Sequence, residues 1–347
     1  MIPLFRLLFS ILLISFKTFC YSQTTVRDYQ NPVFTPVMAD PSVLYDSLSR
    51  KFYVYGTADN WDDGKGVRYI PIASSDNLTD WMYFSEAFSK ITKPNWQAGG
   101  IWAPDVVKVN DNFHLYYSIS KWGDLNPSIG VAIGNSPLGP FYDKGRIFSS
   151  QEIDVPNSID PFYFEDNGKK YLFWGSFSSS LNQGTYGIEL SPDGLEYINK
   201  ESKFKIAAGD WEAVVIHKRG NYYYMFGSKG SCCEGANSSY HVLVARSINL
   251  KGPYLDKDGH DISIRGNGTL ILEGNSKIVG PGHTSRIMTD LEGQDWILYH
   301  GIQSNRPILP NNTNRRCLFM DKVNWKDDWP IINDGTPSIT NRIGPKF

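Results

Sequence analysis

The run YLFWGS at residues 171–176 is an aromatic stretch that ends in small or polar residues, and the pattern recurs along the chain. The related runs are FYVYGT at 52–57, FHLYYS at 113–118, YYMFGS at 223–228 and WILYHG at 296–301. The first residues of consecutive runs are 61, 58, 52 and 73 positions apart. A repeat of this length in a strand-rich sequence is typical of blades arranged around an axis. The sequence therefore predicts an all-β fold, a five-bladed β-propeller in a single domain.

Turn-forming residues precede each aromatic run, for example Asn110-Asp111-Asn112 and Asp166-Asn167-Gly168. Each repeat is thus expected to begin with a strand, a turn and a second strand. In a propeller the first strand of every blade lines the axial channel, so residues that are distant in sequence can meet there. No linker or low-complexity segment interrupts residues 36–345, which argues against a second module.

Composition excludes several classes of partner. The net charge is −2 and there is no extended basic run, so the chain lacks the electrostatic footprint of a nucleic-acid binder. A content of 14% aromatic residues, with 31 Gly and 20 Pro, suits many short strands joined by tight turns. We expect a monomer that acts on a neutral substrate.

The N-terminus has the layout of a secretory signal peptide, which we assign to residues 1–23, with the propeller over 24–347. Arg6 precedes an apolar stretch from Leu7 to Phe16 that is too short to span a membrane. The protein is therefore expected to be secreted or periplasmic, without a membrane span. A lipid anchor at Cys20 is the less favoured alternative, because the residues before it are not the small ones that lipoprotein processing favours.

Removal of this segment leaves Cys232, Cys233 and Cys317 in a compartment that permits disulfides. The two neighbouring cysteines could bond to each other, or one of them could pair with Cys317. The sequence does not choose between these arrangements. A metal site is less favoured, because no CxxC spacing accompanies them.

Each aromatic run has an ionisable residue 8 to 13 positions upstream. These residues are Asp40, Asp105, Asp160, Glu212 and His283. If each lies on the innermost strand of its blade, four carboxylates and an imidazole converge on one axis. Carboxylates held close together acquire different proton affinities, which is what cleavage of a glycosidic bond needs. One carboxyl group must donate a proton to the leaving oxygen, and another must stay ionised to activate water or to attack.

Five ordered motifs resemble the signatures of glycoside hydrolase family 43: ADPSV from residue 39, WAPDV from 102, SIDPFYF from 158, WEAVVI from 211 and GPGHTS from 280. The resemblance runs over essentially the whole mature chain and includes RCLFMDKVNWKDDWP at 316–330, which is similar to the closure of the last blade in that family. Such a resemblance implies a five-bladed propeller that acts on arabinose- or xylose-containing plant polysaccharides. The segment 229–247 is most similar to endo-1,5-α-L-arabinanases, which implies arabinan as the substrate.

Carried over residue by residue, the resemblance makes Asp40 the general base, Glu212 the general acid, and Asp160 the carboxylate that tunes and orients the acid. It implies inversion by single displacement, with the two working carboxyl groups roughly 6.5–9.5 Å apart. Asp105 has no matching catalytic role, and we expect it to be structural.

Sugar contacts are expected from a second set of residues. Trp102 is predicted to stack on a sugar ring, and Arg316 to bind hydroxyl groups or hold the base. The hydrogen-bonding residues near Asp160 are expected to be Asn157, Ser158 and Ser176. His283 matches a family residue that faces a calcium or other ion at the propeller centre, so we expect a calcium ion there and no organic cofactor.

Three alternatives remain open. Many endo-arabinanases have His directly before the base, whereas this chain has Ala39. An exo-acting α-L-arabinofuranosidase or β-xylosidase of the same fold is therefore the first alternative. A carbohydrate-binding propeller without catalysis is the second, although binding alone would not need Asp40, Asp160 and Glu212 together. The third is a protein-interaction propeller that binds no polysaccharide.

Overall fold

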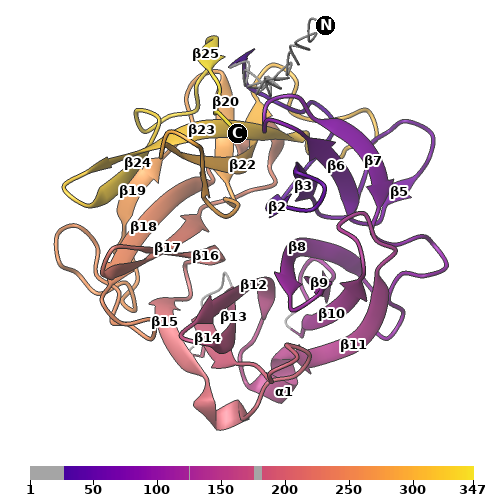
Figure 1. The fold of residues 1–347 in the computed structure, drawn as a ribbon, viewed down its shortest axis with the longest axis vertical. Coiled ribbons are helices and arrows are strands. Elements are labelled where there is room, and N and C mark those ends of the chain that lie inside the picture. Colours follow the sequence, from indigo (N-terminus) through magenta and orange to yellow (C-terminus); the bar gives the residue numbers. More distant parts are fainter. Residues whose placement is uncertain (1–26, 125, 176–181) are drawn as a thin grey trace, which may run out of the picture.

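The computed structural model describes residues 27–124, 126–175 and 182–347. The expected signal peptide, Cys20 and Ser176 lie outside the described residues. Five antiparallel sheets surround a central axis like the blades of a fan (Figure 1). The prediction of an all-β, five-bladed propeller is confirmed.

Each blade has four main strands. They follow one another in the chain from the innermost strand, at the axis, to the outermost. Blade 1 contains β2 (Ser42–Asp46), β3 (Lys51–Tyr55), β6 (Pro71–Ser75) and β7 (Met82–Glu86). Blade 2 contains β8 (Gly100–Val109), β9 (Asn112–Ser120), β10 (Ser128–Gly134) and β11 (Tyr142–Ser149). Blade 3 contains β12 (Ile159–Asp166), β13 (Lys169–Gly175), β14 (Gly184–Glu189) and β15 (Phe204–Ala208). Blade 4 contains β16 (Glu212–Arg219), β17 (Tyr222–Lys229), β18 (His241–Ser247) and β19 (Thr269–Leu272).

Blade 5 contains β20 (Ile278–Gly282), β22 (Asp295–Gln303), β23 (Arg316–Lys326) and β24 (Trp329–Ile332), with β21 (Met288–Thr289) paired to β22. The short elements outside the blades are β1 (Asp28–Tyr29), β4 (Asp59–Asn60), β5 (Val67–Arg68), β25 (Arg342–Ile343), α1 (Ser150–Ile153), η1 (Lys200–Ser202) and η2 (Gly235–Asn237). Helix is thus scarce in the described chain.

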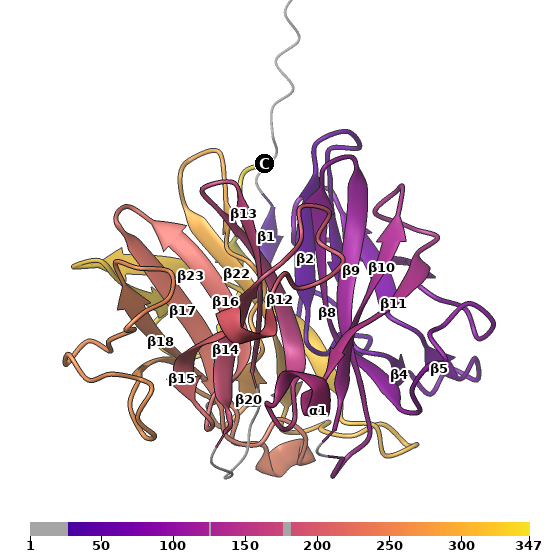
Figure 2. The ribbon, with the colours of Figure 1, turned by 90° about the horizontal axis from the view of Figure 1, so that it is seen from below.

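The ring of blades is closed by the N-terminal lead-in, which lies along blade 5. The N–H groups of Val33 and Met38 donate to the carbonyls of Leu318 and Arg316 in β23, at 2.9 Å each. The two ends of the described chain also meet, because β1 pairs with β25. Figure 2 shows β1 beside the last blades at one face of the propeller. The block at 316–330 is therefore part of the closure, as its resemblance implied.

The aromatic runs form the second strand of every blade, and their side chains fill the space between neighbouring blades. Tyr116 of blade 2 stacks on Tyr163 of blade 3 with ring centroids 5.7 Å apart. Trp174 is fully buried and its indole N–H donates to Ser158 Oγ at 3.0 Å. Truncation of a buried aromatic residue to Ala typically costs about 3–5 kcal/mol, so these runs supply much of the stability of the ring.

The polar residue that ends an aromatic run joins its blade to the next one through a hydrogen bond. It accepts a backbone N–H from the next blade, from within its inner strand or just after it: Ala103 N–H to Thr57 Oγ1 at 2.8 Å, Asp160 N–H to Ser118 Oγ at 3.0 Å, and His283 N–H to Ser228 Oγ at 3.0 Å. At the point of closure, the Asp40 N–H donates to His300 Nδ1 at 3.1 Å. These four bonds hold the inner strands at fixed positions around the axis.

Candidate active site

A cavity of about 1030 Å³ opens at the axis and is lined by residues from all five blades. Asp40 comes from the segment before β2, and Trp102 from β8. Asp160 and Glu212 come from the starts of β12 and β16, and His283 follows β20. The structure therefore brings together the three expected catalytic carboxyl groups and the expected ion-binding histidine.

One residue in or next to the inner strand takes the same unusual backbone conformation in each blade. The residues with left-handed φ are Asp40 at 53°, Ala103 at 45°, Asp160 and Ala213 at 57°, and His283 at 47°. In blades 2, 3 and 4 this residue lies within a break in the register of the first two strands, and in blade 5 His283 follows such a break by one residue. A left-handed conformation costs a residue other than glycine about 1–3 kcal/mol and is typical of functional sites. Of these five residues, Asp40, Asp160 and His283 line the cavity.

This shared position corrects the alignment of the five upstream residues. Asp40, Asp160 and His283 occupy it, but Glu212 precedes it by one residue and Asp105 follows it by two. The expectation that all five residues meet at one site is correct for the four that line the cavity, but Asp105 does not line it.

Asp105 is instead buried between blades. It accepts hydrogen bonds from Ser42 Oγ at 3.1 Å and from the Tyr163 N–H at 2.7 Å. Its Oδ2 also lies 2.5 Å from Nη2 of Arg286 in blade 5. This carboxylate thus ties blades 1, 2, 3 and 5 together beneath the cavity, and its surroundings support the expected structural part.

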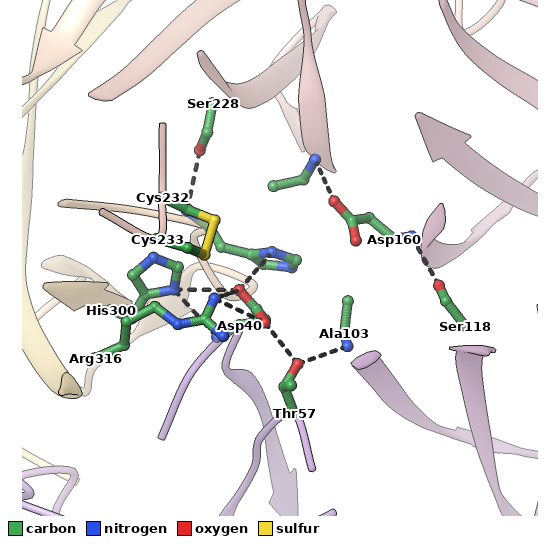
Figure 3. Close-up of polar contacts among 12 residues, drawn as sticks. Asp40, Thr57, Ala103, Ser118, Asp160, Ser228, Cys232, Cys233, His300 and Arg316 are labelled. Carbon is green, nitrogen blue, oxygen red and sulfur yellow. Dashed lines mark hydrogen bonds and ion pairs between the residues drawn. A yellow bond between two sulfur atoms is a disulfide. The ribbon is translucent and has the colours of Figure 1, made fainter. Parts of the chain in front are cut away.

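Asp40 lies in a strongly polar environment (Figure 3). Nη1 of Arg316 lies 2.9 and 3.2 Å from its two carboxylate oxygens, and the Thr57 hydroxyl donates to Oδ2 at 2.5 Å. Nδ1 of His283 is 3.4 Å from Oδ1. Burial alone would raise the pKa of Asp40, but the charge of Arg316 and the contact with His283 hold that pKa well below its ordinary value. Asp40 is therefore ionised.

His300 also lies beside Asp40, but it acts on the backbone of that residue and not on its charge. Burial lowers the pKa of His300 to about 4, so its ring is neutral near neutral pH. Because its Nδ1 accepts the Asp40 N–H, the 3.3 Å approach of the same atom to Oδ1 of Asp40 is not a second hydrogen bond. The ring stacks on Tyr240 at a centroid distance of 5.6 Å. His300 therefore supports the backbone of Asp40 rather than its charge.

The other two carboxyl groups have raised proton affinity. Burial raises the pKa of Glu212, and the negative charge of Asp160 raises it further, while a hydrogen bond from Tyr240 acts in the opposite direction. Burial also raises the pKa of Asp160, whose Oδ2 accepts the Ala213 N–H at 3.0 Å. One cavity thus holds an ionised carboxylate at Asp40 and a group that favours its protonated form at Glu212.

The expected sugar contacts are distributed unequally. Trp102 and Asn157 line the cavity, and so does Arg316, which also bonds to Asp40. Ser158 was an incorrect expectation: its side chain is fully buried inside blade 3, where its hydroxyl donates to the Val155 carbonyl and accepts from Trp174. Ser176 lies outside the described residues.

Several cavity residues were missed by sequence reasoning. Trp122 lies against Trp102 with ring centroids 5.6 Å apart and is 79% exposed. Asp59 also lines the cavity, and burial raises its pKa to about 6 although Arg316 acts to lower it. The sequence carried a signal for two of these residues. Thr57 ends the first aromatic run, and Asp59 follows that run by two residues. Tyr240 had none, because its contact with Glu212 depends on the path of a loop.

Among the residues that the structure describes, no cluster of carboxylate or histidine ligands that could hold an ion lines the cavity. His283 is near Asp40, but Arg316 and Thr57 already occupy that carboxylate. Among the described residues, three metal-ligating side chains come together only at Asp256, Asp258 and His260, which do not line the cavity. Calcium prefers six or more oxygen ligands, so we assign no step of the reaction to an ion.

An ionised carboxylate and a carboxyl group that favours its protonated form, in one cavity, are what an acid–base glycosidase requires. A family model places the chain within that class. The model for glycosyl hydrolases family 43 matches residues 29–330, and the chain belongs to this family. It is a glycoside hydrolase.

Named relatives and solved structures agree with this assignment. The chain is 34% identical to an extracellular exo-α-(1→5)-L-arabinofuranosidase of Cellvibrio japonicus, over 76% of this chain and 80% of the relative. It is 29% identical to an extracellular endo-α-(1→5)-L-arabinanase of Bacillus subtilis, over 85% and 87%. The structure of an α-L-arabinanase of Cellvibrio cellulosa superposes with a TM-score of 0.72 at 29% identity, covering 86% of this chain and 95% of that one. Within the described ranges, no helix is long and apolar enough to cross a membrane.

Proposed function

We propose that this protein hydrolyses α-1,5-linked L-arabinan within the chain, as an inverting endo-arabinanase. The observation that carries the proposal is the opposite direction of two pKa shifts in one cavity, downward at Asp40 and upward at Glu212. The substrate is supported by relatives named for α-(1→5)-arabinan and by a similar α-L-arabinanase structure in complex with arabinohexaose, with a TM-score of 0.72.

The reaction follows from the protonation states. Asp40 accepts a proton from a water molecule as the water oxygen attacks the anomeric carbon. Glu212 donates its proton to the glycosidic oxygen as the bond from that oxygen to the anomeric carbon breaks. Asp160 keeps the proton on Glu212 through its negative charge, and its bond to the Ala213 N–H fixes its place beside the acid. The configuration at the anomeric carbon is inverted in this single step.

Anomeric analysis of the first product tests this mechanism. Proton nuclear magnetic resonance during hydrolysis of linear arabinan should show the β-anomer first, before mutarotation. The α-anomer as first product would refute inversion. Asp40→Ala and Glu212→Ala should each abolish hydrolysis, and variants as active as the parent would refute the assignment of these residues.

Exo action is the alternative that a specific observation favours, because one relative is an exo-α-(1→5)-L-arabinofuranosidase and Ala39 departs from the pattern of many endo enzymes. Products from linear, debranched arabinan separate the two. Endo action gives a ladder of oligosaccharides, whereas release of arabinose alone would establish the exo mode. Activity on xylan or on aryl xylosides instead would indicate a β-xylosidase, and binding of arabinan without cleavage would indicate a carbohydrate-binding propeller.

We further propose that the protein acts outside the cytoplasm as a monomer, after removal of residues 1–23. The relatives named as extracellular support this location. Intact mass of the exported protein would identify the cleavage site, and light scattering its oligomeric state. A calcium ion held by His283 and water stays a prediction, which assays with and without a chelator would test.

A further inference from the structure

The loop between β17 and β18 carries a disulfide between two sequence neighbours, Cys232 and Cys233. The sequence left open whether these two cysteines bond to each other or whether one of them pairs with Cys317. In the structure they bond to each other, and Cys317 is free and buried. Both bonded cysteines are half-buried and line the same cavity as Asp40 and Glu212. Figure 3 draws the disulfide together with Asp40 and Arg316, which line the same cavity.

The loop is held firmly at the disulfide. The side-chain amide of Asn314, which precedes β23, donates to the Cys233 carbonyl at 3.0 Å and accepts the Gly235 N–H at 2.7 Å. The N–H groups of Ser239 and Tyr240 both donate to the Ser231 carbonyl at 3.0 Å. Bonds from blade 5 and from the far end of the loop therefore fix the ring that the two cysteines close.

The disulfide differs chemically from the charged groups of the cavity wall. It carries no charge and no proton donor, and its sulfur atoms are polarisable and apolar in contact. The charged and ionisable part of the wall consists of carboxyl groups, two arginines, a lysine and one histidine, His283. The large aromatic side chains of the wall are Trp102 and Trp122 of blade 2 and Tyr240, which lies in the same loop of blade 4 as the disulfide. Ligand sites combine apolar surfaces with a few polar groups that fix orientation, and a sugar ring presents C–H groups on its faces and hydroxyls at its edge.

We propose that the Cys232–Cys233 disulfide is a sugar-contact surface of this cleft, on which the C–H face of a neutral pentose unit packs. The inference rests on the proposed function and deepens it, because it assigns a binding subsite to the loop of blade 4. A rigid apolar ring loses little conformational entropy when it binds, so its contribution falls mainly on substrate affinity.

The test compares steady-state kinetics on linear arabinan for the parent and the double variant Cys232→Ser/Cys233→Ser. We expect KM to rise about tenfold, which corresponds to about 1.4 kcal/mol, with a smaller change in kcat. Asn314→Ala is the matched control, because it loosens the loop without altering the sulfur surface. If the disulfide only staples the loop, both variants will lower the melting temperature and kcat in parallel and leave KM at the parental value.

A measurement on the parental chain avoids dependence on folding of the variant. A water-soluble phosphine reduces the disulfide to two thiols; the phosphine is oxidised to its oxide, taking its oxygen from water, and two electrons and two protons pass to the sulfurs. KM should rise on reduction and return on reoxidation, while buried Cys317 has no bond to reduce. Parental KM in both the double variant and the reduced parent would overturn the inference and leave the proposed function standing. A parent that does not cleave arabinan would overturn the proposed function, and the inference with it.

Discussion

Replacement of Arg316 by Met should move the acidic limb of the pH–rate profile to higher pH. Nη1 of Arg316 lies 2.9 Å from Oδ1 of Asp40, and both side chains are only slightly exposed, at 11% and 12%. Two unit charges at that separation attract each other by about 6 kcal/mol at an effective dielectric constant near 20. Without the guanidinium, burial of Asp40 remains as the main influence and raises the pKa of the carboxyl group. The base then becomes protonated, and inactive, at a pH where the parent is still active.

The same structure gives the sign of the effect on stability. The folded-state pKa of Asp40 is depressed, so its ion pair stabilises the parent above the ordinary pKa of Asp, and that contribution is lost as pH falls through the folded value. Removal of one partner of a buried pair typically costs about 3–5 kcal/mol, part of which the variant recovers by protonating Asp40.

The assay is kcat/KM on linear arabinan across the pH range, with folding monitored by circular dichroism. We expect the ratio of kcat/KM at about pH 7 to that at about pH 5 to increase at least about tenfold over the parent. Arg316→Lys is the control, because it keeps the charge and should keep most of the parental profile. An unshifted acidic limb in Arg316→Met, with activity reduced equally at every pH, would refute the reasoning.

Four other predictions follow from the site. Glu212→Gln should abolish hydrolysis yet retain oligosaccharide affinity by calorimetry, since the amide keeps the shape of the acid but carries no transferable proton; loss of binding would contradict this. Tyr240→Phe removes the hydrogen bond that lowers the pKa of Glu212, so the basic limb should move to higher pH, and a downward shift would be inconsistent with it. Thr57→Val leaves the buried Ala103 N–H unpaired and should reduce the free energy of unfolding by about 2–4 kcal/mol in denaturant titrations, whereas Thr57→Ser should be near parental. Burial holds the pKa of His300 near 4, below its ordinary value, so the contribution of this residue to stability should fall as pH drops from about 6.5 toward 4, by up to about 3 kcal/mol. The measurement is the difference in free energy of unfolding between the parent and His300→Phe in urea, and a difference that stays constant over that range would contradict this.

The fold could be predicted from the sequence because its repeat has a simple physical cause. Each aromatic run must be buried between two blades, so the same pattern of side chains returns with every blade, as at Tyr116 and Trp174. The carboxyl groups of Asp40 and Glu212 could be found because their motifs lie at the start of the inner strands. These features depend on local sequence and on the repeat alone.

The errors came from features that the repeat does not fix. Counting back from the aromatic runs treats Asp105 and Asp160 alike, but a shift of a few residues at a break in strand register places one side chain in the interior and the other in the cavity. Ser158 was expected near a sugar, yet the turn before β12 directs its hydroxyl to the Trp174 indole. Tyr240 reaches Glu212 only because the loop that carries it folds back, and such long connections have no pattern that a sequence alone reveals.

The polar end of each aromatic run joins the scaffold to the chemistry. Thr57 accepts the Ala103 N–H and donates its own proton to Asp40, so one hydroxyl both latches blade 2 to blade 1 and binds the carboxylate. At the closure of the ring, His300 takes the place of the hydroxyl and accepts the Asp40 N–H. Loss of either latch would therefore displace Asp40 as well as loosen a blade. Asp40, the proposed base, thus lies where the first and last blades meet, and hydrogen bonds from both blades hold it in place.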